Sequence, residues 1–283
     1  MDERNQSAGL LYVDGDKYKT EEGFKLQLSS TAEFPDSGIY IFRTDFHIPS
    51  KNIKQNYLAV MSSKKKIGHG HLDQGSFILY KNNIPVVMDT GIEGYFNVST
   101  QWHLSSYSHA CMQFGTKKQK RRSQNCGFIN LSAGTYSLER GWVDVPDSSE
   151  VLEVETGGKK ERIVIQIENK EGKGIHIREI IFEKETGITW IKDQVKEYDG
   201  KLLFSLPMVM ESAVVKESQV LGKGYYGVNM DVIFHTPVCS IELEQGRTTP
   251  MFDTKNENPM LIYCRAVAEA SVGFMVELRP YEG

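Results

Sequence analysis

The feature that most constrains this chain is a series of short apolar runs, each bounded by turn-forming residues, spread along most of its length. Several runs alternate between apolar and polar residues with a period of two, which is the pattern of a half-buried strand. Turn formers recur between the runs at short spacing. The runs are residues 39–43, 57–61, 76–80, 163–167, 175–182 and 188–191. This pattern predicts many strands with short connections, as in a large antiparallel sandwich.

The composition agrees with this prediction. The chain has 13 Tyr and 13 Phe with abundant Val and Ile, whereas alanine, the best helix former, is scarce. No convincing amphipathic pattern longer than about three turns is visible. We therefore expect an all-β fold, a large layered antiparallel β-sandwich with few or no helices. The sequence changes character near residues 146–150, but no linker separates two parts, and we interpret residues 1–283 as one domain.

Charge and segment patterns exclude several classes of protein. A net charge of −4 and a pI of about 6.0 argue against a basic nucleic-acid-binding domain. The basic run 117–122 lacks interleaved aromatic residues, so we favour a solvated loop over a polyanion site. No apolar stretch is long enough for a transmembrane helix, and the first residues lack the apolar core of a signal peptide. We expect neither nucleic-acid nor membrane partners, and the compartment stays open between periplasmic, secreted and cytoplasmic.

Nucleotide and thiolate chemistry also receive little support. The chain has four cysteines but no Cys-x-x-Cys pair, so we expect free, mostly buried thiols rather than a thiolate zinc site. The motifs of a serine hydrolase elbow and of a P-loop are absent from the sequence. The glycine spacing of residues 222–227 resembles a dinucleotide motif but falls among predicted strands, so nucleotide binding is not expected.

Histidines are few and concentrated in one part of the chain. Four of the seven fall between positions 69 and 109. His69 and His71 would share one face of a strand, and a hairpin after residue 80 would carry Asp89 back towards them. His109 follows, and two imidazoles with one carboxylate form a plausible zinc site with an open position. The alternative is a solvent-facing or hydrogen-bonded histidine pair, with Asp89 in an ordinary turn.

Three segments occur in a distinctive order: Gly68-His69-Gly70-His71-Leu72-Asp73-Gln74-Gly75-Ser76-Phe77, Met88-Asp89-Thr90-Gly91 and Ser108-His109. Together they resemble the heparinase II/III-like family of polysaccharide lyases, whose pattern runs H-G-H-x-D, a Ser-Phe strand, an apolar D-x-G, an aromatic loop and S-H. Residues 34–43 are similar to the family's opening strand, and residues 178–193 to its C-terminal hairpins.

The resemblance implies a two-part enzyme, with an N-terminal α/α toroid followed by a layered β-sandwich and an active site between them. This chain matches the sandwich only, so the toroid is an expected partner, as is an acidic polysaccharide or oligosaccharide. By the same resemblance, His69 is the catalytic residue, and His71, Asp89 and His109 are ligands of a Zn²⁺ ion. The residues expected to contact substrate are Arg43, Tyr95, Trp102 and Tyr107.

The implied reaction is β-elimination on a glycan that contains uronic acid. Two other readings stay open: a carbohydrate-binding or scaffold module without catalysis, and a zinc hydrolase with a metal-bound water. The sequence does not distinguish heparin-like chains, hyaluronan and alginate as substrates, nor endo from exo action.

Overall fold

The structure is a computed structural model. It describes residues 30–44, 54–63, 71–92, 100–103, 105–116, 147–169, 174–246, 248 and 261–283. Its elements are almost all antiparallel strands, and the helical elements among the described residues are single turns. These are α1 (Thr100–His103) and the 3₁₀ turns η2 (Ser106–Ser108) and η5 (Tyr225–Gly227). The predicted all-β fold is confirmed.

The first sheet is built from the N-terminal strands and three later ones. Strands β1 to β5 pair in chain order, and β5 then pairs with β11, which also pairs with β6 and β15. Strand β14 completes this sheet beside β15. The strands are β1 (Thr31–Phe34), β2 (Ile39–Arg43), β3 (Tyr57–Met61), β4 (Phe77–Lys81), β5 (Ile84–Val87), β6 (Met112–Phe114), β11 (Lys201–Lys216), β14 (Ser240–Gln245) and β15 (Leu261–Glu269).

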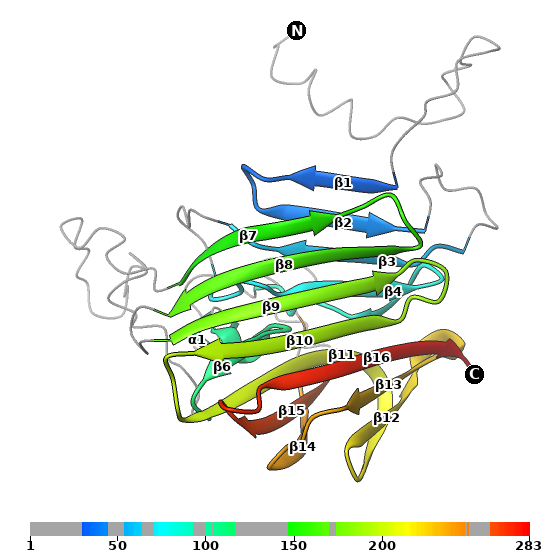
Figure 1. The fold of residues 1–283 in the computed structure, drawn as a ribbon. Coiled ribbons are helices and arrows are strands. Elements are labelled where there is room, and N and C mark those ends of the chain that lie inside the picture. The colour runs from blue at the N-terminus through cyan, green and yellow to red at the C-terminus, as the bar shows by residue number, and fades with distance from the viewer. Residues whose placement is uncertain are drawn as a thin grey trace, which may run out of the picture.

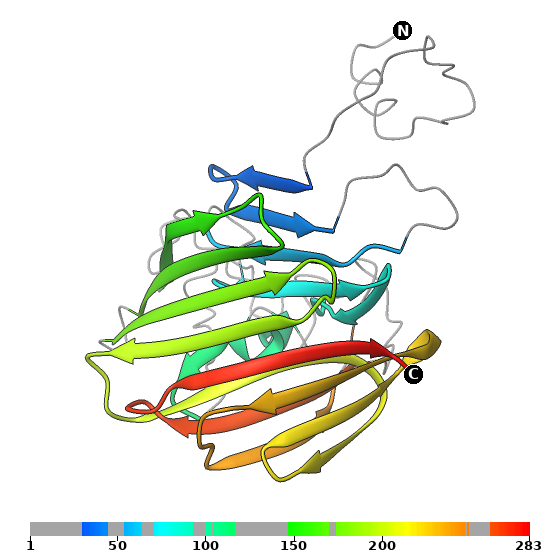
Figure 2. The same cartoon turned by 45° about the vertical axis from the view of Figure 1, so that its right-hand side comes forward.

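The second sheet contains the long hairpins of the C-terminal half. Its order is β7-β8-β9-β10-β16-β13-β12, and β12 pairs with the end of β11. Figures 1 and 2 show β8, β9 and β10 lying in front of the strands of the first sheet. The strands are β7 (Asp147–Glu155), β8 (Lys160–Asn169), β9 (Gly174–Glu183), β10 (Thr189–Lys196), β12 (Gln219–Gly224), β13 (Val228–Phe234) and β16 (Phe274–Glu282).

Strand β11 belongs to both sheets. Residues 201–209 pair with β15, and residues 210–216 pair with β12 after a register shift between Met210 and Ser212. The first part of the strand is almost continuously buried, and the last part is largely exposed. A bulge bends a strand and increases its twist. The register shift therefore coincides with the point at which β11 passes from one layer to the other.

One hydrophobic core fills the space between the layers. The inward side chains of β9 are those at every second position, among them Ile180 and Phe182. They belong to the same cluster as Leu58 of β3 and Leu79 of β4 from the first sheet. Burial of this apolar surface drives the two sheets together, at roughly 25 cal/mol per Å² removed from water.

Three polar side chains share this core. Arg178 and Asp193 are fully buried on neighbouring strands, and Nε and Nη2 of Arg178 donate to Oδ1 and Oδ2 of Asp193 at 2.7 and 2.8 Å. His176 Nε2 donates to Oδ1 of the same carboxylate at 2.7 Å. Burial alone would raise the pKa of Asp193, but Arg178 and His176 outweigh it and hold that pKa well below its usual range. Burial lowers the pKa of His176, consistent with a neutral ring.

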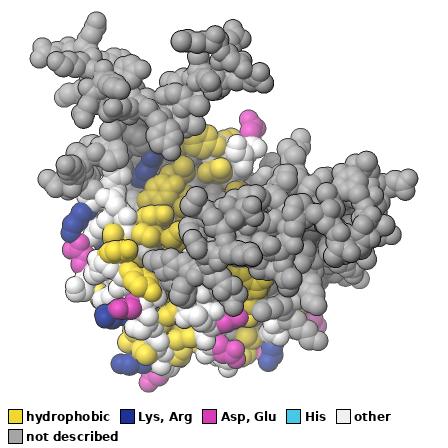
Figure 3. Space-filling model, turned by 180° about the vertical axis from the view of Figure 1, so that it is seen from behind, with side chains coloured by type: hydrophobic (Ala, Val, Ile, Leu, Met, Phe, Trp, Pro, Cys, Tyr) yellow, Lys and Arg dark blue, Asp and Glu magenta, His cyan; other side chains and the backbone are white. Residues whose placement is uncertain are grey.

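Apolar side chains also face outward from the first sheet. Ile41 of β2, Ala59 of β3 and Ile78 of β4 are cross-strand neighbours and are half-buried. Figure 3, the view from behind, shows hydrophobic side chains gathered on the described part of the back face, with charged ones nearer its margin. The back face is therefore mixed in character.

Several local predictions are confirmed. The six predicted runs fall on β2, β3, β4, β8, β9 and β10, with ends that differ by a few residues. Cys111 and Cys264 are buried and Cys239 is exposed; Cys126 lies outside the described residues. Within the part of the chain that the structure describes, no helix has the length and apolar character needed to span a membrane.

The buried ion pair yields a prediction for stability. Asp193→Asn leaves the Arg178 guanidinium buried without its counter-charge, and we expect a loss of about 3–5 kcal/mol in the free energy of unfolding. Urea denaturation measures this loss. Asp231→Asn is the control, since Asp231 is half-buried on β13 and accepts only a 3.3 Å hydrogen bond from Tyr281. Equal, small losses in both variants would contradict the assigned importance of the pair.

Candidate functional site

The structure brings together the three residues predicted as metal ligands. His109 Nδ1 lies 2.7 Å from Oδ2 of Asp89, and His109 Nε2 lies 3.2 Å from Nδ1 of His71. His109 is fully buried, whereas the side chain of Asp89 is 44% exposed. The three side chains form a row from Asp89 through His109 to His71.

The hairpin between β4 and β5 carries Asp89 to this place, as the sequence predicted. Asn82 and Asn83 form its turn with φ of 52° and 67°, a left-handed conformation that asparagine tolerates. Asp89 follows β5, and its Oδ1 accepts a hydrogen bond from the backbone of Gly91 at 2.8 Å. Asp89 therefore caps a local turn and also binds His109, and its predicted role as a zinc ligand stays a prediction.

The segment that carries His109 is held by side chains of β15. Tyr263 is fully buried and donates its hydroxyl to the carbonyl of Ser108 at 2.7 Å. Arg265 Nη1 donates to the carbonyl of Tyr107. The guanidinium carbon lies 3.4 Å from the ring centroid of Tyr107 and 4.2 Å from that of Tyr263. This cation–π stack fixes the backbone immediately before His109.

The charge on Asp89 is stabilised locally. Burial would raise its pKa, but the charge and hydrogen bond of His109, the Gly91 N–H and the more distant His71 hold the pKa well below its usual range. An ionised Asp89 accepts a hydrogen bond from His109 Nδ1, and the other ring nitrogen of His109, Nε2, faces Nδ1 of His71.

The donors in this row match zinc chemistry in type. Two ligands of one tetrahedral zinc ion lie about 3.3 Å apart when each bond is about 2.0–2.1 Å, and the two facing imidazole nitrogens are 3.2 Å apart. Asp89 binds the far side of His109, in the manner of a carboxylate that orients a metal-bound histidine. Among the described residues, no group of three or more His, Cys, Asp and Glu side chains is arranged to hold a metal ion.

Three of the other predicted site residues, Arg43, Trp102 and Tyr107, lie in the described part of the chain. His69 and Tyr95 lie outside the described residues. Trp102 of α1 is half-buried, with its ring 5.7 Å from that of Tyr263. Tyr107 is half-buried and donates to Glu244 at 2.9 Å. Arg43 ends β2, and its Nε donates a hydrogen bond to the carbonyl of Ser30 at 3.4 Å. Strand β2 does not carry His71 or His109.

The sequence did not indicate several residues that support the row. His103 is buried, and its Nδ1 lies 3.3 Å from the hydroxyl of Thr90, the neighbour of Asp89. Tyr263 and Arg265 act on residues more than 150 positions earlier, and no spacing rule links such distant positions. The signal available in the sequence was a buried strand, β15, that contains an arginine, since a buried cation requires partners.

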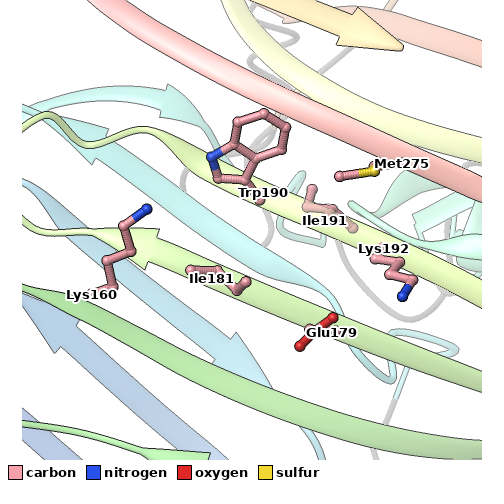
Figure 4. Close-up of a pocket in the computed structure, with 7 residues that line it drawn as sticks. All are labelled: Lys160, Glu179, Ile181, Trp190, Ile191, Lys192 and Met275. Carbon is pink, nitrogen blue, oxygen red and sulfur yellow. The ribbon is translucent and has the colours of Figure 1, made fainter. Parts of the chain in front are cut away.

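A separate groove lies on the outer face of the second sheet. It has a volume of about 260 Å³, and Figure 4 shows Trp190, Ile181 and Met275 along it, with Lys160 and Lys192 at its sides. Lys160 also pairs with Glu183 at 2.6 Å. These side chains alternate with the core residues of β9, β10 and β16, so the groove faces away from the first sheet and is not part of the His71–His109 row.

Comparison with known proteins identifies the family. A sequence model described as "Heparinase II/III-like, C-terminal" matches residues 27–206, more than half of the chain. The chain belongs to this family. The predicted resemblance is therefore confirmed. A search of curated proteins finds no match.

Several solved structures of heparinases share this fold. "Heparinase III-BT4657 gene product" superposes with a TM-score of 0.69 at 16% identity, covering 91% of this chain and 37% of that one. The structure of heparan sulfate lyase HepC from Pedobacter heparinus has a TM-score of 0.69 at 14% identity, and the match covers 92% of this chain and 37% of that one. "Heparinase III" gives 0.68 at 15% identity, covering 89% and 37%. The chain thus spans little more than a third of the length of these proteins.

The support for His109 can be tested on Tyr263. Tyr263→Phe removes a buried donor and leaves the Ser108 carbonyl without it, and we expect a loss of about 1–3 kcal/mol in the free energy of unfolding. Tyr198→Phe is a matched control, since its hydroxyl also donates to a backbone carbonyl, that of Lys201, but at an exposed site and at 3.3 Å. For Tyr198→Phe we expect the free energy of unfolding, measured by urea denaturation, to change by less than about 0.5 kcal/mol. Indistinguishable variants would show that the Tyr263 bond does not hold the segment.

Proposed function

We propose that this chain is the β-sandwich part of a polysaccharide lyase that cleaves glycans containing uronic acid by β-elimination. The observation that carries the proposal is the family match over residues 27–206. Two further facts support it: the fold similarity to heparinase III and heparan sulfate lyase structures, and the contact between His71 and His109.

β-Elimination requires a base, an acid and groups that neutralise the substrate's carboxylate. A base removes the proton from C5 of the uronic acid, and the electron pair of that C–H bond becomes the C4–C5 double bond. The C4–O bond breaks, and an acid protonates the departing oxygen. Because the carboxylate next to C5 disfavours a second negative charge, positive or hydrogen-bonding groups must face it.

We assign the base or the carboxylate-neutralising role to His69. Imidazole exchanges protons near neutral pH, which suits either role. His69 is two residues before His71, which lies in the row with His109 and Asp89. The remaining acid or base, and much of the substrate contact, would come from an α/α toroid that packs against the sandwich. Tyr95, Trp102, Tyr107 and Arg43 remain the proposed substrate contacts on this chain.

We further propose that His71 and His109, with Asp89, hold a zinc ion. The donor types and the 3.2 Å separation of the two nitrogens support this. A bound zinc ion would link the two segments and add positive charge near the substrate's carboxylate. Asp89 orients His109 through Nδ1, and His109 and His71 present the two facing nitrogens.

Metal content tests the zinc proposal. We expect near-stoichiometric zinc in the purified chain by elemental analysis and its loss in His71→Ala, because one of two facing ligands is removed. His235→Ala is the control, since that imidazole lies on the outer face beside Glu277, 3.0 Å away, and should leave the zinc content unchanged. A folded chain without zinc would refute this part of the proposal and leave the sandwich assignment standing.

Product analysis tests the lyase proposal. In the longest reading frame that contains this chain, we expect unsaturated products from an acidic glycan, detected by the ultraviolet absorption of the new double bond. His69→Ala should lower the rate by about 10²–10⁴-fold if the imidazole is the general base. Retained activity would exclude His69. Glycan binding without a product would favour a binding module, and cleavage without a double bond would favour a zinc hydrolase.

A further inference from the structure

One buried side chain of the second sheet reaches both segments that carry the facing imidazoles. Arg178 of β9 is fully buried, and its Nη1 donates to the carbonyl oxygens of Gly75 and Ala110, each at 2.8 Å. Ala110 directly follows His109, and Gly75 lies four residues after His71 in the sequence. Because a single nitrogen binds both oxygens, these carbonyls lie within two hydrogen-bond lengths of each other.

The two segments are otherwise attached to different strands. Gly75 donates its N–H to the carbonyl of Met61 in β3 at 2.8 Å. Cys111 instead accepts at its carbonyl from the N–H of Ser205 in β11, also at 2.8 Å. A further contact between the segments, from Cys111 Sγ to the Gln74 carbonyl, is 3.7 Å long and uses a weak thiol donor. The two bonds from Arg178 are charge-assisted and much stronger.

The direction of Nη1 is set from the opposite edge of the guanidinium. Nε and Nη2 are bound by the two oxygens of Asp193, which lies directly across from Arg178 in the β9–β10 register. The guanidinium is planar, so fixing one edge fixes the other. His176 binds the same carboxylate and completes the buried group.

The backbone conformation and close packing at Gly75 require a glycine at this contact. Its φ is +73°, which disfavours any residue with a side chain. A Cβ at this position would lie 2.9 Å from Cδ1 of Ile167 and 3.3 Å from Cδ of Arg178. The backbone at Gly75 therefore packs directly against the arginine stem, and its carbonyl accepts the hydrogen bond from Nη1.

We propose that Arg178 is a positioning residue that sets the separation between His71 and His109. It acts from the second sheet through the carbonyls of Gly75 and Ala110 and touches neither imidazole in the described contacts. This inference rests on the proposed function, since it concerns how the two facing nitrogens are presented to a zinc ion.

The test compares zinc affinity in variants of the full chain, with Zn²⁺ alone as the probe after removal of bound metal by a chelator. Arg178→Lys keeps a positive charge for Asp193 but lacks the fork that reaches two carbonyls. We expect its zinc affinity to fall about 10- to 100-fold, as for other residues that act through a ligand. The control is Lys184→Met, which breaks another buried ion pair, with Glu161, and should leave the affinity unchanged.

A second variant covers the case in which Arg178→Lys does not fold. Gly75→Ala leaves the Arg178–Asp193 pair intact but displaces the segment, and we expect it to weaken zinc binding as well. Gly157→Ala is its matched control, because Gly157 also has a positive φ, +90°, but nothing within 4 Å of the added Cβ. Unchanged zinc affinity in folded Arg178→Lys or Gly75→Ala would overturn the proposal.

A measurement without metal separates this inference from the zinc proposal. In ¹⁵N-histidine NMR spectra, Arg178→Lys or Gly75→Ala should shift the ring signals of both His71 and His109, and Lys184→Met should shift neither. If the parent chain binds no zinc but these signals move, the zinc proposal fails and the positioning role stands. If the signals stay in place, the positioning role is wrong.

Discussion

The buried ion pair between Arg178 and Asp193 determines how the two layers of this protein meet. Each ion costs several kcal/mol to remove from water, and the cost is offset only when geometry and additional hydrogen bonds are complete. Here the carboxylate accepts from two guanidinium nitrogens and one imidazole, and the guanidinium donates onward to two carbonyls. Arg178 and Asp193 belong to the second sheet and the two carbonyls to connections of the first, so this polar group links the two layers.

Buried side chains from other parts of the fold support the segments that carry the imidazoles. The second sheet has long, regular hairpins, whereas the imidazoles of His71 and His109 lie on connections between strands of the first sheet. Each of these segments is held by a side chain from elsewhere: Gly75 and Ala110 by Arg178, Ser108 by Tyr263, and Tyr107 by Arg265. The supporting groups are buried and donate to backbone oxygens, so they fix the main chain rather than competing with the site's own side chains. Precise placement on loops requires support of this kind.

The sequence predicted the strands well because their signal is local. Alternation located β2, β8 and β9, and the asparagine turn located the hairpin that carries Asp89. The same alternation could also have indicated that Arg178 needs a buried partner. Positions 178, 180 and 182 share one face of β9, and the apolar residues at 180 and 182 make it the core face, so a buried arginine needed a buried carboxylate nearby. The roles of Tyr263 and Arg265 were not accessible, because register alone joins β15 to β11 and nothing local specifies it.

The row from Asp89 to His71 has a consequence for the site as a whole. His109 donates a hydrogen bond from Nδ1 to the ionised carboxylate of Asp89, so Nε2 is the nitrogen that faces Nδ1 of His71. Two lone pairs at 3.2 Å would repel, so either a proton on one of the two nitrogens or a shared cation must lie between them. The negative charge of Asp89 makes the imidazole of His109 more basic, which strengthens its binding to a proton or to a cation. Arg178, by holding both backbones, keeps the rings from relieving that repulsion by separation. The same buried arginine that binds both backbones would therefore favour a proton or a cation between the imidazoles.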